Sequence, residues 1–332
     1  MTRTIYLDNS ATTALCPEAI AAMRQVMEET YGNPSSLHAV GLAAEKIVTA
    51  ARSDVLAALG VRGDGRQLIF CGSGSEANNL ALIGTYTAKR RRTGARVILT
   101  AGEHSSTEAA AEYLASLGAD VVRLSTKDGA LDMDEAAAAL TENTVLVSSM
   151  LVNNETGALY PVADLFRLAK AKCPDVICHC DAVQGFLKIP LSPRTLGADI
   201  VTVSAHKIHG PKGSGFLYID EKVKIRPLIL GGGQQNGMRS GTDNVPGIAG
   251  LAKSAEIVYK HFDEQTAQMR ACKHRLIEGL RELDDVVIHG MPEEEGAPQI
   301  VNASFLNVRS EVLLHTLEDR QIYVSAGSEA RR

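Results

Sequence analysis

The residue whose type and setting best suit covalent chemistry is Lys207, which follows an apolar run at residues 200–204 and enters a loop rich in glycine and proline. Lysine normally stays solvated, so a lysine at the end of a buried strand is unusual. Burial and neighbouring cations lower the pKa of an amine and make it nucleophilic toward an aldehyde. The alternative, a solvated loop lysine, fits Lys212 better, because Pro211 and Gly213 flank it.

A carboxylate with a possible cofactor role is Asp181, which follows the apolar run 176–180. An acid at such a position can simply cap the next helix. Beside a pyridine cofactor, the same carboxylate would keep the ring nitrogen protonated, so that the ring accepts electrons. Gln184, three residues later, could then hydrogen-bond the phenolic oxygen of that ring.

A phosphate site is predicted at residues 71–76 (CGSGSE), between a strand pattern and a helix pattern. Gly72 and Gly74 let backbone amides approach an anion, and Ser75 adds a hydroxyl group. The segment matches neither GxxxxGK[ST] nor the GxGxxG spacing of dinucleotide-binding proteins. A simple glycine-rich turn remains the alternative.

His104 follows the apolar run 97–100 and could stack on an aromatic cofactor and pass protons, although an isolated histidine is more often structural. The order of the features is more informative than any one of them. A phosphate cup, a stacking histidine, an acid and a lysine each follow a predicted strand, where ligands bind in sheets of this type. Together they are the groups that pyridoxal 5'-phosphate (PLP) requires.

A largely parallel sheet covered by helices on both faces would position these residues, because short apolar runs alternate with helical patterns. The last two strands are separated only by a loop of glycine and proline, so that pair could be antiparallel. The predicted strands are 67–71, 97–100, 120–124, 145–150, 176–180, 200–204 and 216–219, and the predicted helices are 76–89, 107–117, 133–140 and 162–172.

The pattern changes on either side of this α/β region. A helical pattern precedes it, and a long helical stretch followed by short strands comes after residue 245. We therefore expect a smaller α+β C-terminal domain. The expected parts are an N-terminal segment 1–15, a large PLP-binding domain 16–250 and a small domain 251–332, with short strands at 286–288, 301–305 and 323–325.

Composition excludes several classes of function. The chain has 332 residues, 45% of them hydrophobic, and a net charge of −5, which argues against a nucleic-acid binder. Neither a signal peptide nor a membrane-spanning stretch is evident, so we expect a cytoplasmic protein without a membrane partner. We expect the six cysteines to be reduced thiols. Cys178 and Cys180 lie in a strand pattern without a CxxC partner, so no metal site is expected.

Several motifs together resemble the cysteine desulfurases of the class V aminotransferase superfamily, over residues 5 to about 328. Within that family the chain is similar to the branch that supplies sulfur for iron–sulfur clusters and tRNA thiolation. The motifs are residues 6–13 (YLDNSATT), 32–36 (GNPSS), 152–157 (VNNETG), 181–184 (DAVQ), 204–213 (SAHKIHGPKG), 231–233 (GGG) and 237–242 (GMRSGT).

The resemblance implies a PLP-dependent transferase of fold type I that works as a homodimer. Lys207 matches the lysine that forms the Schiff base with the cofactor. His104 matches the ring-stacking histidine, and Asn154 matches a residue that contacts cofactor and substrate. Asp181 and Gln184 match the partners of the ring nitrogen and the phenolate.

The same resemblance assigns the phosphate side of the cofactor. Gly74 and Ser75 match the phosphate-binding pair, with serine in place of a commoner threonine. Ser204 and His206 match further ligands on that side. Thr242 matches a residue that reaches the phosphate of the neighbouring subunit, so that the dimer completes each site.

The implied reaction converts L-cysteine to L-alanine, with the sulfur passed through a loop cysteine to a protein acceptor. Here residues 325–329 (SAGSE) match the loop, but the next residue is Ala330 rather than cysteine.

The family also continues for several dozen residues, which carry an arginine for the substrate carboxylate. We favour a shortened or altered form of an active enzyme. One alternative is a natural PLP-binding protein that has lost persulfide transfer. The other is that the given sequence lacks residues which the protein has.

We therefore expect the chain as written to bind PLP but to turn over cysteine poorly. An aminotransferase or a selenocysteine lyase of the same superfamily is the nearest rival, and aminotransfer needs no cysteine. A non-catalytic PLP-binding partner in a sulfur-transfer assembly is a third possibility. An oxidoreductase is the most distant, because the nucleotide-binding fingerprint is absent.

Overall fold

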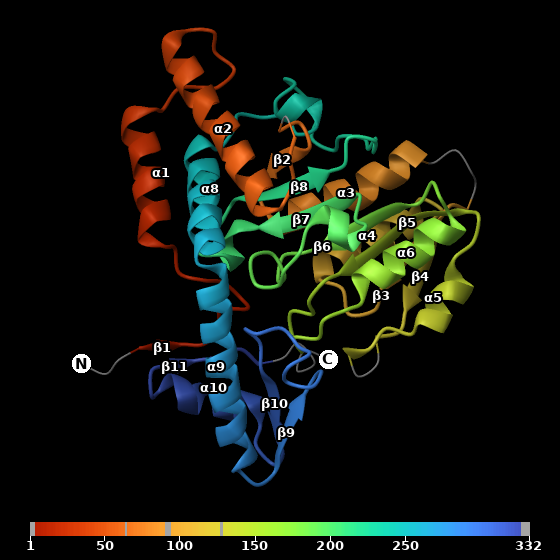
Figure 1. Cartoon of the computed structure of the whole chain (residues 1–332), viewed down its shortest axis with the longest axis vertical. Helices are drawn as coiled ribbons and strands as arrows, with labels where there is room; N and C mark the ends of the chain where they lie inside the picture. Colours follow the sequence, from red (N-terminus) through yellow and green to blue (C-terminus); the bar gives the residue numbers. More distant parts are fainter. Residues whose placement is uncertain (1–3, 64, 90–93, 127–128, 327–332) are drawn as a thin grey trace.

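A seven-stranded sheet forms the centre of the computed structural model, which describes residues 4–63, 65–89, 94–126 and 129–326 (Figure 1). Its strand order is β2-β8-β7-β6-β5-β3-β4. The strands are β2 (Leu68–Cys71), β3 (Arg96–Thr100), β4 (Asp120–Leu124), β5 (Thr144–Met150), β6 (Ile177–Asp181), β7 (Ile200–Ser204) and β8 (Gly215–Ile219).

The strand directions confirm the expected α/β sheet. Neighbours from β4 through β3, β5 and β6 to β7 pair in parallel, whereas β8 pairs antiparallel with both β7 and β2. The loop between β7 and β8 is too short for the crossover that a parallel pair needs, which explains the antiparallel pairing. Asp181 lies inside β6 rather than after it, because it pairs with Met150 of β5.

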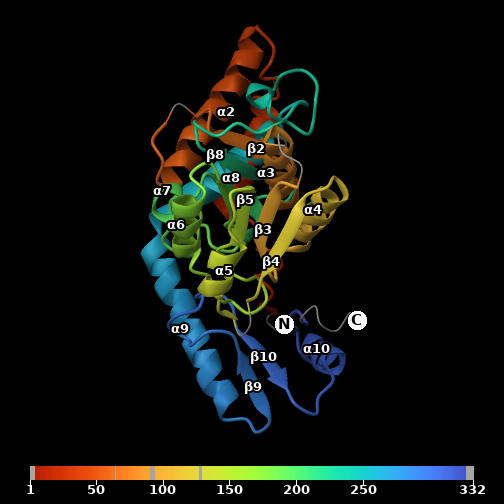
Figure 2. The same ribbon diagram turned by 90° about the vertical axis from the view of Figure 1, so that its right-hand side faces the viewer.

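Helices cover both faces of the sheet (Figure 2). One face packs against α3 (Gly74–Lys89) and α4 (Ser105–Ser116). The other packs against α2 (Ala39–Ala58), α6 (Val162–Lys172) and α8 (Val245–Lys260). Adjacent strand residues point to opposite faces, and because both faces are covered, β2, β6, β7 and β8 are buried at every position. Each buried large apolar side chain contributes about 1.5–3 kcal/mol.

The remaining elements lie at the side of the sheet and below it (Figure 1). Helix α1 packs on α8, and α9 runs downward to a two-stranded antiparallel sheet of β9 and β10. The N-terminal strand β1 pairs in parallel with β11, so the two ends of the described chain lie side by side. These elements are α1 (Pro17–Glu29), α5 (Met133–Ala139), α7 (Pro193–Leu196), α9 (Phe262–Arg281), α10 (Ser310–Glu318), β1 (Ile5–Tyr6), β9 (Val286–His289), β10 (Asn302–Phe305) and β11 (Ile322–Tyr323).

Two sequence predictions need correction here. The helical stretch after residue 245 is two helices, α8 and α9, that meet at His261. The last short strand is Ile322–Tyr323 rather than residues 323–325, because only those two residues pair with β1. Helix α1 was not predicted, although Pro17 at its first turn and Glu18 are typical of a helix start.

The segment Cys178–His179–Cys180 is part of the core. His179 is buried, with Nδ1 2.8 Å from Ser148 Oγ and Nε2 3.0 Å from Thr202 Oγ1. Burial lowers the pKa of His179 to about 3, so the ring is neutral at physiological pH and both nitrogens are already engaged. Among the described residues no group of three potential metal ligands comes together. None of the described helices is long and apolar enough to cross a membrane.

Candidate active site

The predicted site residues lie along one edge of the sheet, because the carboxyl ends of its parallel strands meet there. Cys71 at the end of β2 pairs with Gly215, and Gly215 also pairs with Ser204 at the end of β7. On the next strand, Asp181 ends β6 and pairs with Met150 at the end of β5. The glycine-rich loop, the lysine loop and the acid therefore occupy neighbouring positions along this edge.

Lys207 ends the short 3-10 helix Ala205–Lys207 that continues directly from β7. Its Nζ donates hydrogen bonds to the backbone oxygens of Ser10 and Ala11, the latter at 2.8 Å, so the N-terminal segment closes over the amine. Burial lowers the pKa of Lys207, and the carboxylates of Asp8 and Asp181 oppose that effect. No carboxylate forms a direct ion pair with this amine in the described chain, which leaves it available for covalent chemistry.

A hydrogen-bond chain connects Asp181 to His104. Asn78 of α3 donates from Nδ2 to Asp181 Oδ2 at 2.7 Å and lies 3.0 Å from Ser106 Oγ. Ser106 Oγ is 2.8 Å from His104 Nδ1, and the exposed imidazole begins α4 as its N-cap. Burial raises the pKa of Asp181, whereas the hydrogen bonds from Asn78 and Val183 and the positive charges nearby lower it. The acid and the histidine are thus held at a fixed separation.

The glycine-rich loop leaves no room for side chains where it meets the sheet. A Cβ atom on Gly74 would lie 3.1 Å from Val183 Cγ2 and 3.3 Å from Ser204 Cβ. A Cβ atom on Gly215 would lie 2.7 Å from the Val203 oxygen. Glycine therefore lets α3 start directly beside Ser204. The N–H groups at the start of a helix suit an anion, although that of Glu76 already donates to Ser73 Oγ at 3.1 Å.

The loop that carries Thr242 is fixed against the glycine-rich loop by an ion pair. Arg239 Nε donates to Glu76 Oε1 at 2.8 Å, and Glu76 Oε2 accepts from the Gly72 N–H at 2.9 Å. Thr242 itself is exposed, as is Ser75 in the first turn of α3. Thr242 therefore contributes nothing to the interior of the described chain.

Gln184 and His206 lie close to Lys207. Gln184 is buried and donates from Nε2 to the Ser10 oxygen at 2.8 Å, the same oxygen that Lys207 contacts. His206 Nδ1 is 3.2 Å from Thr12 Oγ1, and burial followed by the lysine charges nearby lowers the pKa of His206 to about 4. Asn154 is half-buried in the loop after β5.

This set of donors fits PLP. Lys207 offers an amine to the aldehyde, and the first turn of α3 offers N–H groups to the phosphate. Asp181 accepts hydrogen bonds from two neutral donors, Asn78 Nδ2 and the Val183 N–H, so its negative charge is available to a protonated ring nitrogen. The tight contacts at Gly74 exclude a side chain from the start of α3, where the phosphate would bind.

A second buried carboxyl, Glu103, lies next to His104 and was not predicted from the sequence. Glu103 is 7% exposed, and its Oε1 accepts hydrogen bonds from Thr100 Oγ1 and from the Met150 N–H at 2.6 Å. Its Oε2 is buried without a hydrogen-bond partner in the described structure. Burial, with a smaller contribution from Asp181, raises the pKa of Glu103 to about 8. Glu103 is therefore largely protonated and uncharged at neutral pH, so Asp181 can be ionised without a second negative charge nearby.

We expect Glu103→Gln to flatten the pH dependence of stability. Because the pKa of Glu103 is about 8 in the folded chain against 4.5 for a free glutamate, its contribution is fully present below pH 4.5 and is lost as the pH rises toward 8. The free energy of unfolding of the wild type should fall by up to about 1.4 kcal/mol per pH unit in that window, relative to the variant. Denaturant unfolding at a series of pH values measures the difference.

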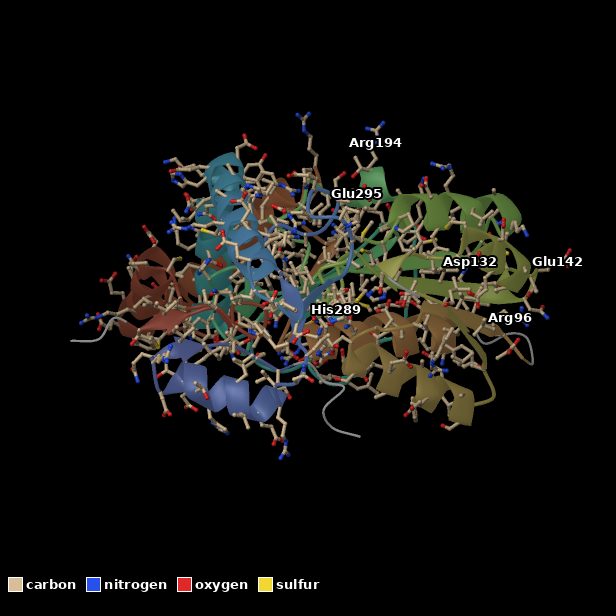
Figure 3. All side chains as sticks on the ribbon, turned by 90° about the horizontal axis from the view of Figure 1, so that it is seen from below. Arg96, Asp132, Glu142, Arg194, His289 and Glu295 are labelled. Atoms are coloured by element: carbon tan, nitrogen blue, oxygen red, sulfur yellow. The ribbon has the colours of Figure 1, made fainter. Side chains whose placement is uncertain are left out.

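The control is Glu142→Gln, because Glu142 is exposed at the periphery of the molecule (Figure 3). This control should show no such difference from the wild type. A constant stability gap between Glu103→Gln and the wild type across the window would contradict a protonated Glu103.

Four of the described cysteines are poor nucleophiles for sulfur transfer. Burial raises the pKa of Cys178 to about 12 and also raises the pKa values of Cys71, Cys173 and Cys180, so these thiols stay protonated. Cys272 is exposed on α9. The predicted loop position, Ala330, lies outside the described residues.

Three site residues escaped prediction for different reasons. Asn78 belongs to a helix and reaches Asp181 over a sequence separation of 103 residues, which no local pattern reveals. Glu103 lies in the turn after β3, where the sequence predicted a role only for His104. Lys188 is buried, with Nζ 3.4 Å from Gln184 Oε1. It left a usable signal, since it is a lysine that follows the apolar pair Phe186–Leu187 four residues after Gln184.

A family model, curated relatives and solved structures all match this chain over most of its length. The family model "Aminotransferase class-V" matches residues 5–331. A cysteine desulfurase from Trichormus azollae is 38% identical over 326 residues, which cover 98% of this chain and 80% of that protein. A solved NifS-like protein superposes with a TM-score of 0.94 at 37% identity, covering 98% of this chain and 88% of its own. SspA in complex with cysteine has a TM-score of 0.83 at 27% identity, covering 98% and 90%.

Proposed function

The chain belongs to the class-V aminotransferase family, and from this premise we propose that it is a PLP-dependent cysteine desulfurase, which converts L-cysteine to L-alanine and passes the sulfur to an acceptor. The observation that carries the proposal is the position of Lys207. Its amine follows β7 directly, at the sheet edge where Asp181 and the start of α3 also lie. The PLP-dependent transferase fold of type I, expected from the sequence, agrees with the NifS-like structure.

The chain's own residues divide the work of holding and using the cofactor. Lys207 would bind PLP covalently, Asp181 would hold its ring nitrogen, and His104 would cover one face of the ring. Gly74, Ser75, Ser204 and His206 would hold the phosphate. When bound, PLP supplies an electron sink that stabilises negative charge at the substrate α-carbon. Lys207 Nζ, freed by the substrate and positioned by backbone carbonyls, would then move the α-proton.

The sulfur atom must pass from the substrate cysteine to an acceptor thiol, formally as a neutral atom. In balance, an acceptor R–SH becomes R–S–SH while cysteine becomes alanine, so no external oxidant or reductant is consumed. The buried thiols of the described chain stay protonated, and position 330 is alanine. We therefore propose that the acceptor thiol comes from outside this chain, either from a protein that receives sulfur or from a small thiol, and that turnover is slow without it.

The test is product formation by the purified chain loaded with PLP. We expect L-cysteine to yield alanine, at a rate that rises when a small thiol such as dithiothreitol is added, with sulfide released in equal amount. Keto-acid-dependent loss of the amino group from amino acids without sulfur would support an aminotransferase instead. Alanine formed from L-selenocysteine alone would support a selenocysteine lyase. Bound PLP without any product would support the non-catalytic partner.

A homodimer is part of the proposal, since Thr242 would serve the phosphate of the neighbouring subunit. An exposed apolar segment of the same loop supports this: Leu228 is 38%, Ile229 41% and Leu230 78% exposed. A surface of this kind is normally covered by a partner. Light scattering on the PLP-loaded chain should give the mass of two chains, and the mass of one chain would oppose the proposal.

A further inference from the structure

Asn153 is a buried amide that precedes Asn154 and that the proposed chemistry does not use. It is 7% exposed, although it belongs to the loop of residues 153–157 that follows β5, here called the Asn154 loop. Its Oδ1 accepts hydrogen bonds from the Glu155 N–H at 3.0 Å, the Thr156 N–H at 2.9 Å and the Thr156 hydroxyl group at 3.2 Å. The Gly157 N–H donates to its backbone oxygen at 3.0 Å. The Asn154 loop is thus folded around this one side chain.

The other end of the same amide reaches the turn of residues 101–104, here called the His104 turn. Asn153 Nδ2 donates to the backbone oxygen of Gly102 at 3.3 Å and lies 3.4 Å from the hydroxyl oxygen of Tyr160. A positive φ of 82° at Gly102, which favours glycine, shapes this turn two residues before His104. The amide of Asn153 therefore serves one segment as an acceptor and the other as a donor.

The His104 turn and the Asn154 loop leave neighbouring strands at the same edge of the sheet. The turn follows β3 and the loop follows β5, and these two strands pair in parallel. The hydrogen bond from Asn153 to Gly102 joins the two segments over a sequence separation of 51 residues. A second link joins the turn to the end of β5, because Glu103 Oε1 accepts from the Met150 N–H at 2.6 Å. Buried polar side chains thus set the distance between turn and loop.

We propose that Asn153 is a positioning residue, whose amide holds His104 and Asn154 at the separation that PLP requires. Both of those residues are predicted to contact the cofactor, and each is carried by one of the two segments that Asn153 joins. A carboxylate of the same shape could accept from the Asn154 loop but could not donate to the His104 turn. This inference rests on the proposed function, because it assumes PLP at this site.

The first experiment measures the dissociation constant of PLP by titrating the cofactor-free chain. Asn153→Ala is introduced into the wild type and into a background that carries both His104→Ala and Asn154→Ala. We expect the substitution to weaken PLP binding about tenfold in the wild type and less than about twofold in that background, because Asn153 acts through the two missing side chains. A residue that contributes only to general stability would weaken binding by the same factor in both.

The second experiment measures amide hydrogen exchange of the full chain without PLP, by mass spectrometry, so that this readout does not depend on the proposed function. We expect Asn153→Ala to speed exchange in both the Asn154 loop and the His104 turn, since both lose hydrogen bonds. Asn153→Asp keeps the acceptor for Glu155 and Thr156 but places a carboxylate oxygen against the Gly102 oxygen. It should therefore speed exchange in the turn and leave the loop as in the wild type.

The matched control is Gln67→Ala. Gln67 is also 7% exposed and donates from Nε2 to Glu221 Oε1 at 2.7 Å, but it precedes β2 at the end of that strand remote from the glycine-rich loop. The control should lower thermal stability and leave the dissociation constant of PLP and exchange in both segments unchanged.

Two results would overturn the inference. One is equal weakening of PLP binding by Asn153→Ala in both backgrounds. The other is an Asn153→Ala variant in which exchange rises in the Asn154 loop but not in the His104 turn. A wild-type chain that fails to bind PLP, with exchange as expected in the variants, would reject the proposed function and leave the link between the two segments supported.

Discussion

Replacing Lys207 by alanine is expected to lower the rate of alanine formation from L-cysteine by on the order of 10³-fold or more, because the variant loses both the covalent link to PLP and the base that moves the α-proton. The backbone oxygens of Ser10 and Ala11 lose their charged donor, but each lies in a segment held by other contacts. We therefore expect the fold to persist. Alanine production and the visible absorbance of bound PLP are the two measurements.

The matched control is Lys212→Ala, because Lys212 lies in the same loop and is exposed. It should keep both the absorbance band and the rate. A Lys207→Ala variant that retains the wild-type spectrum and rate would mean that the amine has been assigned to the wrong lysine.

Asp181→Asn is expected to lower the rate by about 10²–10³-fold while leaving PLP bound, because asparagine keeps the shape but cannot hold the ring nitrogen in its protonated form. The amide oxygen of asparagine can still accept from Asn78, so the connection toward His104 persists, but the Val183 N–H then loses its acceptor. Removing a buried charge opposes that loss, so we expect only a small change in stability. Rate, cofactor content and thermal unfolding give the three readouts.

Asp175→Asn serves as the control, since Asp175 is exposed just before β6 and should leave all three readouts unchanged. A variant Asp181→Asn with the wild-type rate would contradict the assignment of this carboxylate to the ring nitrogen. Loss of cofactor together with loss of stability would indicate a structural role instead.

The strand-end residues could be predicted because an apolar run fixes where a buried strand ends, and parallel strands all end at one edge. That reasoning identified Lys207 after β7 and the loop containing Gly74 after β2. It ended strand β6 at residue 180, one residue too early, because a carboxylate in the sequence suggests the end of a strand even where backbone pairing continues to Asp181.

Contacts between distant segments could not be predicted, since no periodic pattern encodes them. The N-terminal oxygens that receive Lys207 are 196 and 197 residues away in sequence. The Glu103 carboxyl reaches the Met150 N–H over 47 residues. The neighbouring position of β2 and β8 depends on the packing of the whole sheet. Buried polar groups of this kind are found only when their partners are known.

The most direct test of the central claim is to reduce the PLP-loaded wild type with borohydride and map the modified peptide by mass spectrometry. We predict a single pyridoxyl phosphate group, attached to Lys207. Attachment to Lys188 or Lys212, or no attachment under conditions where the chain is folded, would contradict the account of this site.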